Sequence, residues 1–258
     1  MKIVRFSTWK QQQRTRYGLL EDGIVYPLAG NLMDKPIRQG LRYPLKSVHL
    51  LCPVEASKAI CLGLNYRDHA REMGIEAPDS PVFFMKPSSS VIGSGDAIIY
   101  PRELVTQLDF EGELAVVIGR TTRYVSDEEA PNYILGYTIA NDVTARNLQP
   151  KQGQWTIAKS FDTFLPVGPW IETDIDPTNL NIETKVNGIV KQQSNTREML
   201  FSIPHIVSFL SKVMTLNPGD LIITGTPSGV GSLTIGDVVR VSIEGLGYLE
   251  NTVQAEEI

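Results

Sequence analysis

Three acidic residues spaced two apart are the strongest candidates for chemistry in this sequence, and they lie within residues 108–119. A β-strand points alternate side chains to the same side, so Asp109, Glu111 and Glu113 are predicted to form an acidic row along one strand face. Neighbouring carboxylates repel one another, so the row needs either open solvent or a bound cation. On its own, the row fits the solvated face of an edge strand as well as it fits a metal site.

A further carboxylate, Asp142, strengthens the metal hypothesis. It follows a predicted strand of residues 133–140, and residues 142–149 are predicted to start a helix. With Glu111 and Glu113 it would supply three oxygen ligands, and such all-carboxylate sets favour Mg²⁺ or Mn²⁺ over Zn²⁺. Spacing in the sequence alone does not show that Asp142 lies near Glu111 and Glu113 in the fold. The alternative is therefore that the three carboxylates are separate and bind no metal ion.

The segment of residues 65–74 offers a candidate acid-base pair. A short helix is predicted there, with Asn65 as its N-cap and Gly74 just past its C-terminus. His69 and Glu72 would then share one face, one turn apart, as a general base and the group that orients it. A surface histidine with a salt-bridge partner is the more common meaning of such a pair.

A glycine-rich loop of residues 225–231 follows a predicted strand that ends at Thr224. Backbone N–H groups in such loops bind anions. The loop lacks the terminal Lys-Ser/Thr of a phosphate-binding P-loop, so a carboxylate is a better candidate ligand than a nucleotide. A purely structural turn explains the glycines equally well.

The elements that would position these residues are mostly predicted strands. Residues 1–54 are predicted to form a small β-rich N-terminal domain with a hairpin turn at Asp22-Gly23, and residues 55–258 form a second, larger domain. Another hairpin turn is predicted at Asn187-Gly188, and residues 203–213 have the spacing of an amphipathic helix. The predicted class is therefore mixed, β-rich α+β.

The composition is that of a globular protein whose partners are small molecules. The net charge of −5 argues against a general nucleic-acid or anionic-membrane surface. No run approaches the roughly 20 apolar residues of a membrane span, and no secretory signal is visible. Cys52 and Cys61 match neither a redox motif nor a zinc pattern, so buried free thiols and a cytoplasmic location are expected, with no membrane or nucleic-acid partner.

Six motifs, in this order along the chain, resemble those of the fumarylacetoacetate hydrolase family. They are Gly63-Leu64-Asn65-Tyr66 with His69-Ala70-Arg71-Glu72, Phe84-Met85-Lys86-Pro87, Asp109-Phe110-Glu111-Gly112-Glu113-Leu114, Asn141-Asp142-Val143-Thr144-Ala145-Arg146, Trp155-Thr156-Ile157-Ala158-Lys159-Ser160-Phe161-Asp162 and residues 221–231. The resemblance covers about residues 55–255. It implies a mixed β-roll catalytic domain, a homodimer, and one Mg²⁺ or Mn²⁺ per subunit at the mouth of the roll.

Matched position by position, the resemblance also implies roles for individual residues. The positions of the metal ligands are Glu111, Glu113 and Asp142. The positions that hold the 2-oxo-carboxylate end of the substrate are Arg146, Gln149, Lys159 and Thr226. The positions of the water-activating dyad are His69 and Glu72, and Lys159 adds positive charge at the reacting oxygens.

The His/Glu arrangement is that of the shorter acylpyruvase and oxaloacetate decarboxylase members, not of the longer animal fumarylacetoacetate hydrolase, so fumarylacetoacetate itself is not the expected substrate. The resemblance implies hydrolysis of a C–C bond in an acylpyruvate or fumarylpyruvate type 2-oxo acid, through a metal-stabilised enolate. Three alternatives remain: an oxaloacetate decarboxylase or tautomerase, a 2-hydroxyhepta-2,4-diene-1,7-dioate isomerase, and a silent metal- or ligand-binding domain.

Overall fold

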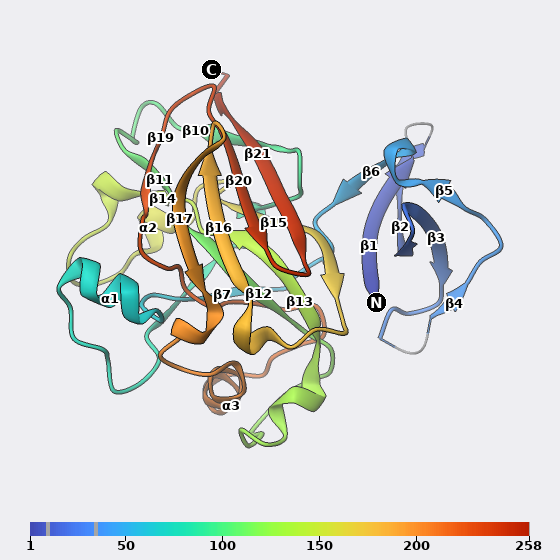
Figure 1. Cartoon of the computed structure of the whole chain (residues 1–258), viewed down its shortest axis with the longest axis horizontal. Coiled ribbons are helices and arrows are strands. Elements are labelled where there is room, and N and C mark those ends of the chain that lie inside the picture. The colour runs from blue at the N-terminus through green and yellow to red at the C-terminus, as the bar shows by residue number, and fades with distance from the viewer. Residues whose placement is uncertain (9–10, 34–35, 258) are drawn as a thin grey trace.

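Strands dominate the computed structural model, which describes residues 1–8, 11–33 and 36–257 (Figure 1). The N-terminal strands are β1 (Lys2–Thr8), β2 (Gln11–Glu21), β3 (Ile24–Ala29), β4 (Ile37–Arg38), β5 (Tyr43–Pro44) and β6 (Val48–Leu51). The later strands are β7 (Ala59–Leu62), β8 (Phe83–Lys86), β9 (Val91–Ile92), β10 (Ala97–Tyr100), β11 (Leu108–Phe110), β12 (Gly112–Ile118), β13 (Ile134–Asn141), β14 (Thr144–Ala145), β15 (Leu165–Glu172), β16 (Asn181–Val186), β17 (Ile189–Asn195), β18 (Leu221–Ile223), β19 (Gly231–Leu233), β20 (Val238–Ile243) and β21 (Gly247–Ala255). The α-helices are α1 (Arg67–Met73), α2 (Thr156–Lys159) and α3 (Ile203–Val213). The predicted β-rich class is confirmed.

Two of the sheets enclose the main core. The largest has the order β4-β3-β2-β1-β15-β13-β12-β18-β7-β8, and the second has the order β10-β21-β20-β16-β17. Figure 1 shows the second sheet crossing in front of β12, β13 and β15, with α3 at one end. Leu114, Ile182 and Ile206, from β12, β16 and α3, belong to one buried apolar cluster between these layers. The fold is thus two packed sheets closed by a helix.

Strand β12 is central, which decides between two interpretations of the acidic row. Its residues are all buried, with Leu114 and Val116 in one apolar cluster and Ala115 and Val117 in another on the opposite face. Strands β13 and β18 pair with its two edges. The interpretation of the acidic row as the solvated outer face of an edge strand, which the spacing alone allowed, is therefore wrong.

The N-terminal strands continue the largest sheet. Strand β1 pairs with β15 in the register Lys2↔Glu172 and Ile3↔Ile171. The predicted hairpin is confirmed, because β2 and β3 are joined at Asp22 and Gly23, whose φ angles of 47° and 75° fit a type I′ turn. The division between residues 1–54 and 55–258 stays a prediction, since one sheet spans both parts (Figure 1).

Two of the predicted local structures are wrong, and tertiary contacts explain both. Asn65 does not cap helix α1, whose N-cap is Tyr66. Its side chain instead donates to Thr224 O at 2.8 Å and accepts from Phe201 N–H at 2.8 Å. Residues 142–149 form no α-helix, because strand β14 pairs there with β11 and a 3₁₀ turn follows at Arg146–Leu148.

Other sequence signals are confirmed. Gly74 ends α1 with a φ of 62°, the left-handed conformation that favours glycine. Helix α3 spans Ile203–Val213 as its apolar spacing predicts, with Ser202 as its N-cap. The turn at Asn187 and Gly188 joins β16 to β17. In the described part of the chain, no helix combines the length and apolarity that crossing a membrane requires.

The two cysteines are buried and unpaired, as predicted. Burial raises the pKa of Cys52 to about 11 and raises that of Cys61 well above its usual value, the charge of Asp142 adding to the second effect. We expect neither thiol to react with a disulfide reagent such as dithiobis(nitrobenzoate) in the native protein at pH 8. At that pH only about one part in a thousand of the Cys52 thiol is the reactive thiolate, and the pKa of Cys61, which is buried as well, is also raised. Both should react in denaturant, and prompt labelling of the native protein would contradict the prediction.

Candidate active site

The chain breaks its strand at Glu111, so the acidic row is split. Strand β11 ends at Phe110, in a small sheet of order β14-β11-β19, and β12 begins at Gly112 in the largest sheet. Between them, the N–H of Glu111 donates to Asn141 Oδ1 at 2.9 Å. Asp109 faces Arg146 instead of the other two acids. The predicted single row of three carboxylates on one strand is therefore wrong.

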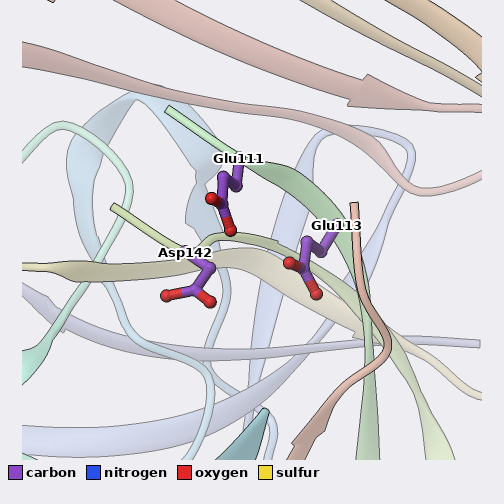
Figure 2. A group of neighbouring side chains, drawn as sticks. All are labelled: Glu111, Glu113 and Asp142. Carbon is purple, nitrogen blue, oxygen red and sulfur yellow. The ribbon is translucent and has the colours of Figure 1, made fainter. Parts of the chain in front are cut away.

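Glu111, Glu113 and Asp142 come together as a buried triad. One carboxylate oxygen from each lies within 4.8 Å of the others. Figure 2 shows the three side chains facing a common space, Glu111 and Glu113 from the β11–β12 segment and Asp142 from the end of β13. Their exposed fractions are 7%, 1% and 1%, so solvent does little to screen their mutual repulsion. An all-oxygen donor set of this kind fits a hard divalent cation.

Two buried lysines contact the triad. Lys159 Nζ lies 2.8 Å from Glu111 Oε2 and 2.8 Å from Asp142 Oδ2. Lys86 Nζ lies 2.6 Å from Asp142 Oδ1 and donates to the carbonyls of Val143 and Phe164. The sequence analysis assigns Lys86 no role. The signal that could have found it is a single lysine at the end of an apolar strand. Lys86 contacts the carboxylate oxygen of Asp142 that Lys159 does not.

Arg146 is a third cation in contact with these carboxylates. Its Nε lies 2.8 Å from Asp109 Oδ2 and its Nη2 lies 2.5 Å from Glu111 Oε1, while Nη1 donates to Gln149. Among the described residues, these ion pairs and the triad link four carboxylates to three cations, for a net charge of 3 − 4 = −1 when all are ionised. The four acids are Asp109, Glu111, Glu113 and Asp142.

The pKa values of the two glutamates move in opposite directions. Burial would raise the pKa of Glu111, but the charges and hydrogen bonds of Lys159 and Arg146 outweigh it and lower that pKa to about 2. Burial raises the pKa of Glu113 well above its usual value, and the charges of Asp142 and Glu111 raise it further. Among the residues that the structure describes, Glu113 thus has no direct ion pair of the kind that Glu111 has, and a cation between the three carboxylates would supply one.

Helix α1 presents the predicted dyad. His69 Nδ1 lies 3.0 Å from Glu72 Oε2, and Glu72 Oε1 accepts the N–H of Gly229 at 3.0 Å. The N–H of Gly225, in the same glycine-rich loop, donates to Glu113 Oε2. Two N–H groups of the loop therefore already bind carboxylates of the protein itself, and binding of a ligand carboxylate by the loop stays a prediction.

One cavity of about 750 Å³ unites most of the predicted site residues. The predicted residues that line it are His69, Glu72, Glu111, Arg146, Gln149 and Lys159. Glu113 and Asp142 are not in its wall and are almost fully buried. Thr226 is not in the wall either, and its hydroxyl already donates to Gly112 O at 2.9 Å and accepts from Gln192 at 2.8 Å. Its role in substrate binding stays a prediction.

The cavity also has an apolar wall that the sequence interpretation did not assign. The ring of Trp155 meets that of Phe84 edge-on, with centroids 5.5 Å apart, and both line the cavity. A Cβ at Gly63 would lie 2.5 Å from the Trp155 ring, so the glycine is needed for the ring to lie there. The two rings therefore share one cavity with Glu111 and Lys159.

A strand-rich fold with an acidic centre beside a cavity that holds a His–Glu pair has the features expected of an enzyme active site. The family model described as Fumarylacetoacetate (FAA) hydrolase C-terminal matches residues 58–254, and one described as Rv2993c-like, N-terminal matches residues 1–53. The chain belongs to the fumarylacetoacetate hydrolase family, and its relatives place it with the shorter members.

Three comparisons illustrate the range of the family. An uncharacterized protein of Methanocaldococcus jannaschii is 55% identical over 204 residues, which are 79% of this chain and 86% of that protein. Oxaloacetate tautomerase YisK of Bacillus subtilis is 45% identical over 225 residues, covering 82% and 75%. The crystal structure of 2-hydroxyhepta-2,4-diene-1,7-dioate isomerase from Mycobacterium marinum superposes with a TM-score of 0.92 at 42% identity, covering 100% of both chains.

Proposed function

We propose that the protein is a Mg²⁺- or Mn²⁺-dependent enzyme that hydrolyses a C–C bond in a 2-oxo acid of acylpyruvate type. The observation that carries the proposal is the buried triad of Glu111, Glu113 and Asp142 beside the cavity. Three carboxylates within 4.8 Å of one another are stable together when a cation lies between them. Bound there, the ion would act as a Lewis acid toward the carboxylate and 2-oxo oxygens of the substrate.

The remaining polar residues of the cavity would bind the same end of the substrate. Arg146 and Gln149 line the cavity next to Glu111 and offer N–H donors to a carboxylate. Lys159 adds a permanent positive charge, since Asp142 and Glu111 together outweigh the effect of burial and raise its pKa. Negative charge that develops on the 2-oxo oxygen would therefore face fixed cations.

His69 would activate the water. Its Nδ1 is hydrogen-bonded to Glu72, which orients the ring and leaves Nε2 to accept a proton. The resulting hydroxide would add to the distal carbonyl, the bond between that carbon and C3 would break, and its electron pair would pass to the pyruvoyl fragment. That fragment takes up the proton, and the products are a carboxylic acid and pyruvate.

A second candidate is oxaloacetate tautomerisation, because a relative that is 45% identical is named for that activity. This reaction moves a proton between C3 and the enol oxygen and needs no attacking water. The residues around the triad would bind oxaloacetate in the same way as an acylpyruvate. The two candidates thus differ in what they require of His69.

A product assay separates the candidates. The purified protein with Mn²⁺ or Mg²⁺ is incubated with acetylpyruvate, fumarylpyruvate, oxaloacetate and a hydroxy-diene dioate, and products are followed by chromatography. We expect pyruvate and the matching acid from an acylpyruvate, and no activity after treatment with EDTA. Tautomerisation of oxaloacetate without acylpyruvate cleavage would favour the second candidate, and turnover that survives EDTA would refute the metal dependence.

A further inference from the structure

Gln192 is a fully buried side chain on β17 that contacts two parts of the site. Its Oε1 accepts the N–H of Gly112 at 3.0 Å. Its Nε2 donates to Thr226 Oγ1 at 2.8 Å and to Pro227 O at 2.9 Å. Both amide hydrogens and one oxygen lone pair are therefore engaged, which fixes the orientation of the side chain.

The first contact lies between two of the proposed metal ligands. Gly112 separates Glu111 from Glu113, and its N–H belongs to the point where β12 begins. A Cβ at Gly112 would lie 2.3 Å from Thr184 Oγ1 and 3.2 Å from Gln192 Oε1, so the backbone runs directly against these side chains. The hydrogen bond to Gln192 thus sets where the chain turns between the two carboxylates.

The other two contacts hold the glycine-rich loop of residues 225–231. That loop donates the N–H of Gly225 to Glu113 and the N–H of Gly229 to Glu72. A Cβ at Gly229 would lie 2.2 Å from Lys191 O, so the loop packs directly on β17. One amide on β17 therefore ties the strand that carries Glu113 to the loop that hydrogen-bonds its carboxylate.

We propose that Gln192 is a positioning residue that holds Glu111 and Glu113 at the separation a divalent cation requires. The inference rests on the proposed metal site. Replacing the amide with an apolar group of similar length would leave Gly112 N–H and Pro227 O without their partner and free the strand and loop to move apart. Hydrogen-bonding partners that orient ligands typically change metal affinity by about 10- to 100-fold when they are lost.

The test measures Mn²⁺ binding by calorimetry, with no substrate present, in the wild-type protein and in Gln192→Met. We expect the variant to bind Mn²⁺ about 10- to 100-fold more weakly. The matched control is Gln193→Met, the exposed neighbour on the opposite face of β17, which should bind as the wild type does. A second control, Val239→Ala, removes buried apolar volume from β20 and should lower the melting temperature without changing affinity.

The outcomes are distinguishable. If the wild type binds no Mn²⁺, the proposed function fails and the inference fails with it. If the wild type binds and Gln192→Met binds equally well, the inference alone is overturned. It is also overturned if Val239→Ala weakens binding as much as Gln192→Met does, because general destabilisation would then explain the loss. Should Gln192→Met not fold, Gln192→Asn keeps the amide one methylene short, and wild-type affinity in that variant overturns the inference.

Discussion

Glu113→Gln is expected to abolish Mn²⁺ and Mg²⁺ binding and metal-dependent activity while leaving the metal-free protein at least as stable as the wild type. The amide oxygen can still accept the N–H of Gly225, and its NH₂ group can donate to Asp142 or Glu111. One of the three proposed carboxylate ligands is lost, however, and with it a charge that would attract the ion. Calorimetry with Mn²⁺ and thermal unfolding with and without Mn²⁺ measure the two effects separately.

The stabilisation by a bound metal ion and the pH dependence of the stability both follow from thermodynamic linkage. At 100 times its Kd, a bound ion stabilises the wild type by about 2.7 kcal/mol, a gain that the variant should lack. In the metal-free wild type the pKa of Glu113 is raised above 4.5, so the stability it contributes is present below pH 4.5 and is lost as the pH rises through the raised value. The stability of metal-free Glu113→Gln relative to the wild type should therefore increase with pH.

Glu183 provides a matched control for Glu113. Glu183→Gln replaces a glutamate on β16 that pairs with Lys185 at 2.6 Å and does not line the cavity. It should bind Mn²⁺ as the wild type does. Unchanged Mn²⁺ affinity in Glu113→Gln would show that Glu113 is not a ligand, and the triad would then have to be explained by its lysines alone.

His69→Ala is expected to lower the rate of acylpyruvate cleavage by about 10²- to 10⁴-fold, the usual contribution of a positioned general base. Decarboxylation of oxaloacetate should fall much less, because it needs positive charge at the 2-oxo oxygen and no attacking water. Lys159 and the metal ion that the triad would hold supply that charge, and the substitution leaves both in place. Initial rates on both substrates at saturating Mn²⁺ give the comparison.

The chain offers a matched control for His69. His205 on helix α3 also lies 3.0 Å from a carboxylate through its Nδ1, but its partner is Asp127 and the pair is exposed. His205→Ala should leave both activities unchanged. If His69→Ala lowers both activities alike, His69 acts in a step common to both, such as proton transfer to the pyruvoyl fragment, and the water-activating role is wrong.

The candidate site could be predicted from the sequence to the extent that its members are close in the chain or belong to an ordered set of motifs. The i, i+3 spacing of His69 and Glu72 placed them on one helical face, and the structure finds their side chains 3.0 Å apart. Asp142 was matched to Glu111 and Glu113 through the family motifs, and the three do meet. Their roles as ligands and bases remain predictions.

What could not be predicted depends on tertiary pairing. Residues 142–149 have the composition of a helix start, but Thr144 pairs with Asp109 across two strands. The alternation of acids predicted one continuous strand, but side chains far away in the sequence, Asn141 and Gln192, take the N–H groups of Glu111 and Gly112 and break it. No local pattern encodes such contacts, because both partners are ordinary polar residues in their own segments.

We expect the charge of the ion-pair cluster around the triad to set the order in which a metal ion and an organic acid bind. With all of its groups ionised and no metal ion, the cluster carries −1, and a 2-oxo acid is itself an anion, so the two repel each other. A proton on Glu113 would remove this repulsion but would supply no attraction. A divalent cation changes the sum to −1 + 2 = +1 and turns repulsion into attraction. We therefore expect compulsory order in the steady-state kinetics, with the metal ion binding before the organic acid and leaving after the products.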